Sequence, residues 1–301
     1  MKRVVSVSLG SSRRDHRVEA DIAGERFCIE RVGTDGDIRK AVALIRELDG
    51  KVDCFGMGGT DLYVVAGRRR YVLRAALPMA RAAQITPIVD GSGLKNTLER
   101  RVVRYLAREY GLPLRGKTAF IVCAMDRFGL AETLVEEGCR IVLGDFMFVL
   151  GVPIPLYSLR ALDLVARVIA PIACRLPMEV LYPTGKKQEE GAKPKWGKYY
   201  LGADIVAGDF HYIRRHLPAE LPGKTILTNT VTREDVDELR RRGVALLITT
   251  TPELEGRSFG TNVMEGVLVA LSGKRPDQLT PQEYDALLDS IGFRPRVQRL
   301  A

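Results

Sequence analysis

The chain has 301 residues, of which 46% are hydrophobic, and a formal net charge of +9. This length accommodates two domains, and the apolar content suffices for buried cores. No apolar run approaches the ~18–20 residues of a membrane span, and the basic residues are dispersed beside acidic ones, so we expect neither a membrane nor a nucleic-acid partner. A basic chain also suits an enzyme that gathers anionic substrates or cofactor phosphates.

The five cysteines are scattered along the chain and form no C-x-x-C pair. Most of them lie in apolar segments, where buried and reduced thiols are usually found. The apolar stretch at the N-terminus is too short for a secretory signal. We therefore expect a cytoplasmic protein without disulfides and without a metal site.

Residues 1–113 mix helical and strand patterns, some of them hairpins, which predicts a smaller α/β domain with some antiparallel pairing. Several of the expected strands end in glycines and small polar residues. The expected elements are a strand at 2–9, hairpins that turn at Ala23-Gly24 and at Gly67, helices at 37–48 and 94–110, and strands at 52–59 and 85–93.

Residues 114–301 alternate more regularly between short apolar runs and helical segments. Such alternation predicts a Rossmann-like, doubly wound parallel sheet, followed here by helices at about 258–272 and 281–290. The strands are expected at 118–124, 140–144, 178–182, 204–207, 225–229 and 244–250, with helices at 127–137, 157–173 and 232–242 between them.

Residues 117–145 have the layout of a nucleotide-binding strand–helix–strand unit. The loop lacks most of the G-x-G-x-x-G glycines, but Asp145 stands where an acidic residue binds a ribose diol and favours NAD over NADP. The loop can equally be a plain turn capped by Asp126, and Asp145 can equally be a cap. Small polar residues at later strand ends extend the predicted crevice. The candidate cofactor-binding residues, for NAD or NADP, are Ala124, Met125, Asp126, Arg127, Phe128, Gly129, Asp145, Asn229, Thr230, Thr249 and Thr250.

The segment Asp90–Thr97 follows a strand and opens a helix, without the spacing of a P-loop. Lys95 can donate a proton or polarise a carbonyl group, and Asp90 or Asp61 can be its carboxylate partner. Ser92 and Asn96 are candidates for binding a hydroxylated substrate. The alternative is a helix with a tight glycine entry and no chemistry.

Two further loops complete the predicted substrate site. Arg13, Arg14 and His16 follow the first strand and suit an anion, and Asn262 opens an apolar helix after a segment rich in glycine and hydroxyl groups. Several polar strand ends in one small domain predict a ligand site between the domains. The other two histidines, His211 and His216, lack metal spacing and are interpreted as surface or packing residues.

The order of a substrate domain, a Rossmann-type domain and final helices, together with MEGVLVALSGKRP at 264–276, resembles the shikimate/quinate dehydrogenase family. That family has a similar late helix followed by a Gly-x-x-Pro turn, and it uses a catalytic Lys–Asp pair. Its N-V-T-x-P-x-K segment is absent here, so Lys95 and Asp90 are candidates by context. The resemblance implies an NAD(P)-dependent oxidoreductase that acts on a small hydroxylated and carboxylated substrate. The alternative is a Rossmann-fold ligand-binding or regulatory protein without hydride chemistry, and a homodimer is left open.

Overall fold

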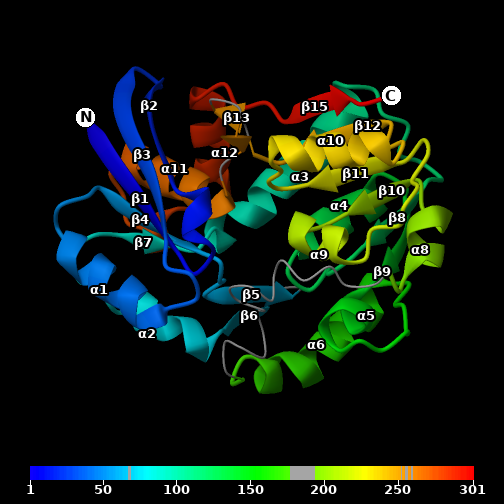
Figure 1. Ribbon diagram of the computed structural model, residues 1–301, viewed down its shortest axis with the longest axis horizontal. Coiled ribbons are helices and arrows are strands. Elements are labelled where there is room, and N and C mark those ends of the chain that lie inside the picture. The colour runs from blue at the N-terminus through cyan, green and yellow to red at the C-terminus, as the bar shows by residue number, and fades with distance from the viewer. Residues whose placement is uncertain (67–68, 177–193, 252, 255–256, 259) are drawn as a thin grey trace.

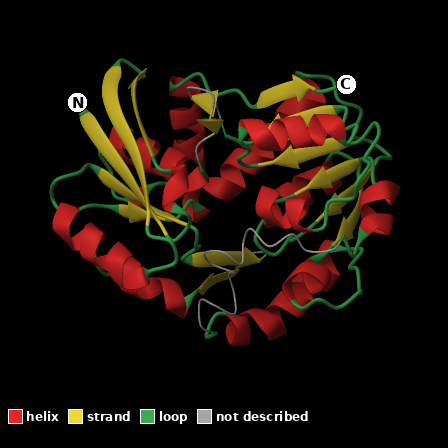
Figure 2. Cartoon of the chain, viewed as in Figure 1, coloured by secondary structure: helices red, strands yellow, loops and turns green. Residues whose placement is uncertain are grey.

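The computed structural model describes residues 1–66, 69–176, 194–251, 253–254, 257–258 and 260–301. Two β-sheets, one from each half of the chain, stand beside each other with helices packed against them (Figure 1). Figure 2 shows helices on both faces of the second sheet, which is the arrangement of a doubly wound fold. The predicted fold class is therefore confirmed.

The first sheet has the order β2-β3-β1-β4-β7. All neighbours pair in parallel except β2, which is antiparallel to β3 at the edge. The hairpin between β2 and β3 turns where predicted, with Ala23 and Gly24 both at positive φ, as tight hairpin turns require. The strands are β1 (Lys2–Ser8), β2 (His16–Ile22), β3 (Glu25–Gly33), β4 (Cys54–Gly58) and β7 (Ile88–Val89).

The second sheet has the order β15-β12-β11-β10-β8-β9. Strand β8 pairs in parallel with β9 on one side and β10 on the other, as the doubly wound prediction requires. The predicted strand at 178–182 lies outside the described residues, and the antiparallel edge strand β15 was not predicted. The strands are β8 (Thr118–Ile121), β9 (Arg140–Leu143), β10 (Ile205–Ala207), β11 (Thr225–Thr228), β12 (Leu246–Thr249) and β15 (Arg296–Arg299).

Two short antiparallel pairs stand apart from the sheets. One is the predicted second hairpin, whose turn residues 67–68 lie outside the described residues. The other lies just before the late apolar helix. Their strands are β5 (Tyr63–Ala66) with β6 (Arg69–Val72), and β13 (Glu253–Leu254) with β14 (Arg257–Ser258).

Polar side chains begin many of the helices. Asp37 accepts hydrogen bonds from two backbone amides of α1, and Thr232 and Thr280 form capping boxes at α10 and α12. The helices are α1 (Ile38–Leu48), α2 (Leu77–Ala80), α3 (Ser92–Arg108), α4 (Phe128–Glu136), α5 (Asp145–Val149), α6 (Leu159–Ala173), α8 (Gly197–Gly202), α9 (Phe210–Arg215), α10 (Arg233–Arg241), α11 (Thr261–Ser272) and α12 (Pro281–Ser290), with 3₁₀ turns at Ser12–Arg14, Arg74–Ala76 and Pro276–Gln278.

The late helix α11 returns to the first sheet. Val263 and Val267 of α11 pack with Val4 of β1 on one face, while Val5 of β1 packs with Ile45 of α1 on the other. Because both faces are covered, β1 is buried from Val4 to Ser8. The two halves are thus joined by the path of the chain as well as by packing, and the predicted boundary between residues 113 and 114 stays a prediction.

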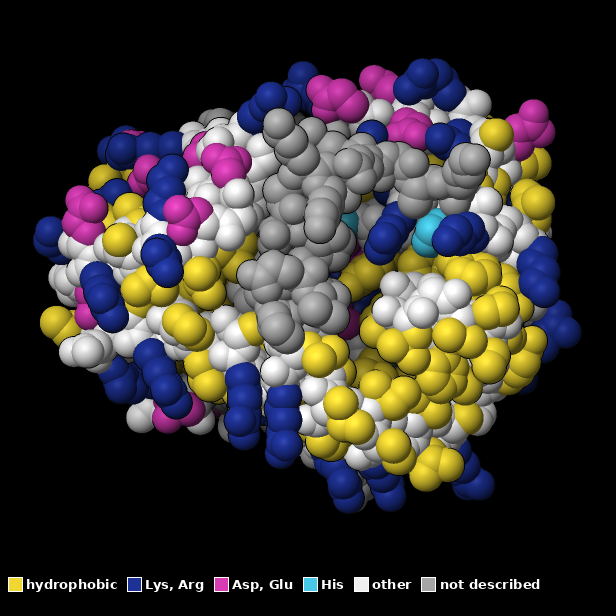
Figure 3. Space-filling view, turned by 60° about the horizontal axis from the view of Figure 1, so that its bottom comes forward, with side chains coloured by type: hydrophobic (Ala, Val, Ile, Leu, Met, Phe, Trp, Pro, Cys, Tyr) yellow, Lys and Arg dark blue, Asp and Glu magenta, His cyan; other side chains and the backbone are white. Residues whose placement is uncertain are grey.

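Helix α6 also joins the halves, since Leu162 belongs to the core beside the second sheet and Cys174, just after the helix, belongs to the core of the first. Its outer side leaves Leu164, Val168 and Ile172 each about two-thirds exposed, at 65%, 64% and 65%. Figure 3 shows hydrophobic side chains gathered on one face of the molecule, with Lys and Arg side chains along its lower border. Among the described residues no helix is long and apolar enough to span a membrane.

Candidate functional site

The site lies where the carboxyl ends of both parallel sheets meet. In each sheet the strand order reverses at one point, between β8 and β10 in the second sheet and between β1 and β4 in the first. Ligands of open α/β sheets bind in the crevice outside such a switch point. The loop after β4 carries Asp61, the loop after β8 carries Asp126, and the loop after β10 carries Asp209. Polar side chains from both halves therefore converge at one place.

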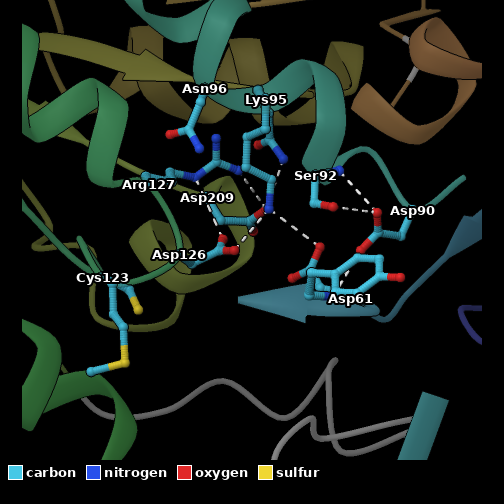
Figure 4. A network of polar contacts seen from close by, with 12 residues as sticks. Asp61, Asp90, Ser92, Lys95, Asn96, Cys123, Asp126, Arg127 and Asp209 are labelled. Atoms are coloured by element: carbon cyan, nitrogen blue, oxygen red, sulfur yellow. Dashed lines mark hydrogen bonds and ion pairs between the residues drawn. The ribbon is translucent and has the colours of Figure 1, made fainter. Parts of the chain in front are cut away.

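Lys95 joins the two halves. It lies one turn into α3, and its ammonium group is 3.2 Å from Asp61 Oδ1 and 2.7 Å from Asp126 Oδ1. Figure 4 shows the side chain reaching from α3 to a point between these carboxylates. The Lys95 side chain is 10% exposed, whereas those of Asp61 and Asp126 are 19% and 21% exposed. The two carboxylates are therefore more accessible to a small molecule than the ammonium group is.

The chain builds this position with a tight entry into α3. Gly91 caps the helix at a φ of +95°, which only glycine adopts readily, so α3 begins directly after β7. Asp90 accepts hydrogen bonds from the backbone amides of Leu62 and Tyr63, at 2.6 and 3.0 Å, and from the Ser92 hydroxyl at 2.6 Å. Asp90 thus ties the loop that carries Asp61 to the helix that carries Lys95. Of the two predicted partners for Lys95, Asp61 makes the contact and Asp90 positions the loop.

The two carboxylates beside Lys95 differ in their acidity. Burial raises the pKa of Asp61 to about 7, and the Asp126 charge adds to this effect while Lys95 opposes it. Burial acts in the same direction on Asp126, but Lys95 and Arg127 outweigh it and hold its pKa below the usual value. Burial alone lowers the pKa of Lys95, but Asp126 and Asp61 hold it above its usual range. Near neutral pH the ammonium group is therefore charged, and Asp61 is the group that exchanges a proton.

Arg127 forms a second buried centre beside the first. Its guanidinium group pairs with Glu99, with Asp209 at 3.3 Å and with Asp126 at 3.9 Å, and its side chain is 3% exposed. Arg127 was predicted to be one of the cofactor-binding residues. In the structure it is instead surrounded by carboxylates from three other positions. Sequence reasoning missed Glu99 and Asp209, because neither stands in a recognisable motif.

The 123–129 loop uses several of its backbone donors internally. The Met125 amide donates to Asp145 Oδ1 at 2.8 Å, and the Gly129 amide, in the first turn of α4, donates to Asn96 Oδ1 at 3.0 Å. A pyrophosphate group at a helix N-terminus needs such amides. Phe128 and Ala124 are buried in the core next to α3. The loop thus offers less to a pyrophosphate than a glycine-rich loop does.

Asp145 is better suited to a sugar. Its Oδ2 atom is buried and has no hydrogen-bond partner in the described structure, and burial raises the pKa of the carboxyl group to about 6. Asp145 opens α5 directly after β9, which is the place of the ribose-binding acid in dinucleotide-binding folds. One feature of a dinucleotide site fits the residues present, therefore, and the pyrophosphate cradle does not.

The predicted polar strand ends form one hydrogen-bonded group. Asn229 donates to Asp209 Oδ2 at 2.7 Å, and Thr251 donates to the Asn229 carbonyl at 2.9 Å. Thr249 and Thr250 are buried after β12, with the Thr250 hydroxyl lacking a partner in the described structure, and Thr230 is half-buried. Asn229 therefore contacts the site by its hydrogen bond to Asp209, and the Thr251 hydroxyl holds the Asn229 backbone in place.

The remaining predicted substrate residues divide between the site and the scaffold. Arg14 reaches across to the second half, where its Nη1 atom is 3.2 Å from His211 Nε2. His16 bonds back to the Arg14 carbonyl group at 3.2 Å, and Arg13 is exposed. Asn262 donates to Ser6 Oγ at 2.7 Å, within the first sheet, and residues 255–256 and 259 before it lie outside the described residues. Within the described part of the chain no cluster of His, Cys, Asp or Glu is arranged to hold a metal ion.

Comparison with known proteins gives a family but no activity. Residues 93–300 match the family described as "Domain of unknown function (DUF8754)", and residues 3–90 match "Domain of unknown function (DUF8753)". No curated protein matches the chain.

Solved structures of similar fold include binding proteins and enzymes. A galactofuranose-binding protein has 12% identity and a TM-score of 0.37, covering 97% of this chain and 99% of its own. A protein described as a putative malic enzyme (malate oxidoreductase) has 12% identity and a TM-score of 0.37, covering 96% and 84%. L-tryptophan dehydrogenase from Nostoc punctiforme has 11% identity and a TM-score of 0.38, covering 96% and 80%. These similarities concern the general α/β fold alone.

Proposed function

We propose that this chain, which belongs to the DUF8754 family, is an NAD(P)-dependent oxidoreductase that acts on a small hydroxylated molecule at Lys95 and Asp61. One observation carries the proposal: a buried ammonium group held between two carboxylates at the junction of two parallel sheets. Strongly perturbed ionisable groups at the switch point of such a fold are typical of active sites.

The acidity of these groups suits the interconversion of an alcohol and a carbonyl group. Asp61, with its pKa raised to about 7, takes the hydroxyl proton of the substrate as a general base and returns it as a general acid in the reverse direction. Lys95 stays charged throughout and stabilises the negative charge that develops on the substrate oxygen. Asp126 keeps the ammonium group in place, since it makes the shorter of the two contacts.

The nicotinamide cofactor would supply hydride transfer, and Asp145 would hold its ribose. The orphaned Oδ2 atom of Asp145 supports this assignment, because a buried carboxylate oxygen without a partner is costly unless a ligand satisfies it. The 123–129 loop offers fewer amides to the cofactor phosphates than a glycine-rich loop does. We therefore expect a modest affinity for the cofactor.

A second function is favoured by that same loop. The engaged amides of Met125 and Gly129 suit a ligand-binding protein that has the Rossmann-like architecture but performs no hydride chemistry. Such a protein would bind a hydroxylated ligand at Asp61 and Asp126 and would have no use for a dinucleotide.

Calorimetric titration of the whole protein with NAD and with NADP distinguishes the two functions. The oxidoreductase predicts binding of one of them at or below millimolar concentration, and predicts that Asp145→Asn weakens it. Asp163→Asn, which removes a partly exposed carboxylate on α6 that pairs with Arg167, is the matched control and should leave binding unchanged. If neither nucleotide binds at concentrations up to several millimolar, the oxidoreductase proposal is wrong and the ligand-binding function is favoured.

A further inference from the structure

The basic side chains at the junction differ in how they are neutralised. Lys95 has two carboxylates, Arg127 has three, and Arg31 pairs with Asp15 at 2.8 Å. In the described structure the guanidinium group of Arg14 contacts the imidazole ring of His211 and no carboxylate. Arg14 therefore keeps an uncompensated positive charge at the place where the two halves of the chain meet.

The lowered pKa of Arg31, which lies on β3, indicates that positive charges lie close together near the Ser12–Arg14 turn. Burial first, and the neighbouring Arg14 charge second, lower the pKa of the Arg31 guanidinium to about 10 against the opposing effect of Asp15 and Asp35. A like charge nearby disfavours the charged form of a group, so the positive charges of Arg14 and Arg31 repel each other. An anion bound to Arg14 would relieve this repulsion.

His211 connects this charge to the proposed catalytic groups. Its backbone amide donates to Asp209 Oδ1 at 2.9 Å, and Asp209 Oδ2 pairs with Arg127, which lies next to Asp126 in the chain. The Arg14–His211 contact is thus only a few side chains away from Lys95. Figure 3 shows a histidine side chain among Lys and Arg side chains beside a recess in the surface.

The neutral form of the His211 ring is compatible with a site that binds an anion. Desolvation lowers the pKa of the ring, Arg14 and Arg214 lower it further, and Asp209 and Asp235 oppose them. A neutral ring accepts a hydrogen bond from Arg14 through Nε2 and carries its own proton on Nδ1. An arriving anion can displace the ring from Arg14 and favour its protonated form, which gives the anion two charged donors.

We propose that Arg14 and His211 bind the anionic group, a carboxylate or a phosphate, of the molecule whose hydroxyl group lies at Lys95 and Asp61. The position of the hydroxyl group at Lys95 and Asp61 rests on the proposed function, whereas the binding of an anion by Arg14 and His211 does not. Because Arg14 comes from the first half of the chain and His211 from the second, the bound anion would also hold the two halves together. The substrate class is then a small hydroxylated acid or a phosphorylated sugar-like molecule.

The test is an NMR titration of the imidazole groups in the whole protein. The chain has three histidines, so His211→Gln identifies the His211 signal directly. The probes are malonate and inorganic phosphate, each added at constant ionic strength. We expect a saturating probe to raise the titration midpoint of His211 by about one pH unit or more, which is the scale of a charge-assisted hydrogen bond. The more effective of the two probes identifies the anionic group.

Variants separate this site from a general effect of surface charge. Arg14→Gln should weaken binding of the better probe about 10- to 100-fold and abolish the change at His211. Arg13→Gln removes the adjacent exposed arginine and should change neither result. Equal weakening by both variants, or a His211 midpoint that does not respond to either probe, would overturn the inference. Lys95→Met changes the proposed catalytic site but not the anion site, so this variant should still bind the probe. Failure of the anion site and failure of the proposed function are therefore distinguishable.

Discussion

Replacing Lys95 by methionine is the most direct test of the charge arrangement at the junction. The substitution keeps the length and apolar stem of the side chain but removes the ammonium group from between Asp61 and Asp126. Two largely buried carboxylates then face each other without their shared cation. Breaking a buried ion pair by removing one partner costs about 3–5 kcal/mol, so we expect a loss of this size in the free energy of unfolding at pH 8.

The loss should depend on pH, and its sign follows from the acidities. In the native protein Lys95 holds the pKa of Asp126 low, so this carboxylate stabilises the fold above its unfolded pKa. Without Lys95 the pKa of Asp126 rises, and burial already raises that of Asp61. A raised pKa gives stability at low pH that is lost as the pH rises. The difference between native protein and variant should therefore grow from pH 5 to pH 8, by up to about 1.4 kcal/mol per pH unit for each carboxyl group.

Urea unfolding followed by circular dichroism at pH 5 and at pH 8 measures this difference. Lys117→Met is the matched control, because Lys117 pairs with Asp204 at the surface and both side chains are more than 40% exposed. It should cost less than about 1 kcal/mol at either pH. Adding Asp126→Asn to Lys95→Met should restore much of the stability at pH 8. An equal loss at both pH values would refute the proposed coupling of Lys95 to the two carboxylates.

Three further predictions follow from the described contacts. Asp61→Asn should lower turnover roughly 100-fold or more, the usual scale for losing a general acid or base, with cofactor affinity unchanged in the same calorimetric titration. Glu265 is buried beside Tyr284, and burial raises its pKa to about 8, so stability should fall as the pH rises toward 8; Glu265→Gln should flatten that fall in melting temperature between pH 6 and 8. Gly33→Ala places a Cβ atom 2.7 Å from the backbone of Ser11 and should cost about 1–3 kcal/mol in urea unfolding, whereas Gly202→Ala, with no atom within 4 Å, should cost almost nothing.

The regular part of the fold could be predicted from the sequence because its signals are local. Apolar runs of four to seven residues separated by amphipathic segments are the pattern of buried parallel strands, and β8 to β12 lie where that pattern predicted them. The edge strand β15 (Arg296–Arg299) was missed for a physical reason. Its sequence, RVQR, has a single apolar residue, and only its pairing with β12 makes it a strand.

The contact between Lys95 and Asp61 was one of two predicted alternatives, and the choice between them depended on long-range structure. Asp90 and Asp61 both follow strands of the first sheet, so the sequence places both near α3. Backbone amides of the 62–63 turn take up the Asp90 carboxylate, and this leaves Asp61 to face Lys95. No sequence pattern reports which carboxylate a turn will occupy. Whether the contact is catalytic stays a prediction.

The excess of acid over base at the junction is a property that only the folded chain has. Two cations, Lys95 and Arg127, face four carboxyl groups, those of Asp61, Glu99, Asp126 and Asp209. A low-dielectric site disfavours such an excess of like charge, so burial raises the pKa of those carboxyl groups whose cations do not outweigh it. Burial raises the pKa of both Asp61 and Glu99, while Asp126 and Asp209 stay acidic beside their cations. Glu99 is almost completely buried, whereas Asp61 is one-fifth exposed. Of the two carboxyl groups with a raised pKa, therefore, Asp61 is the one that a substrate hydroxyl group can reach.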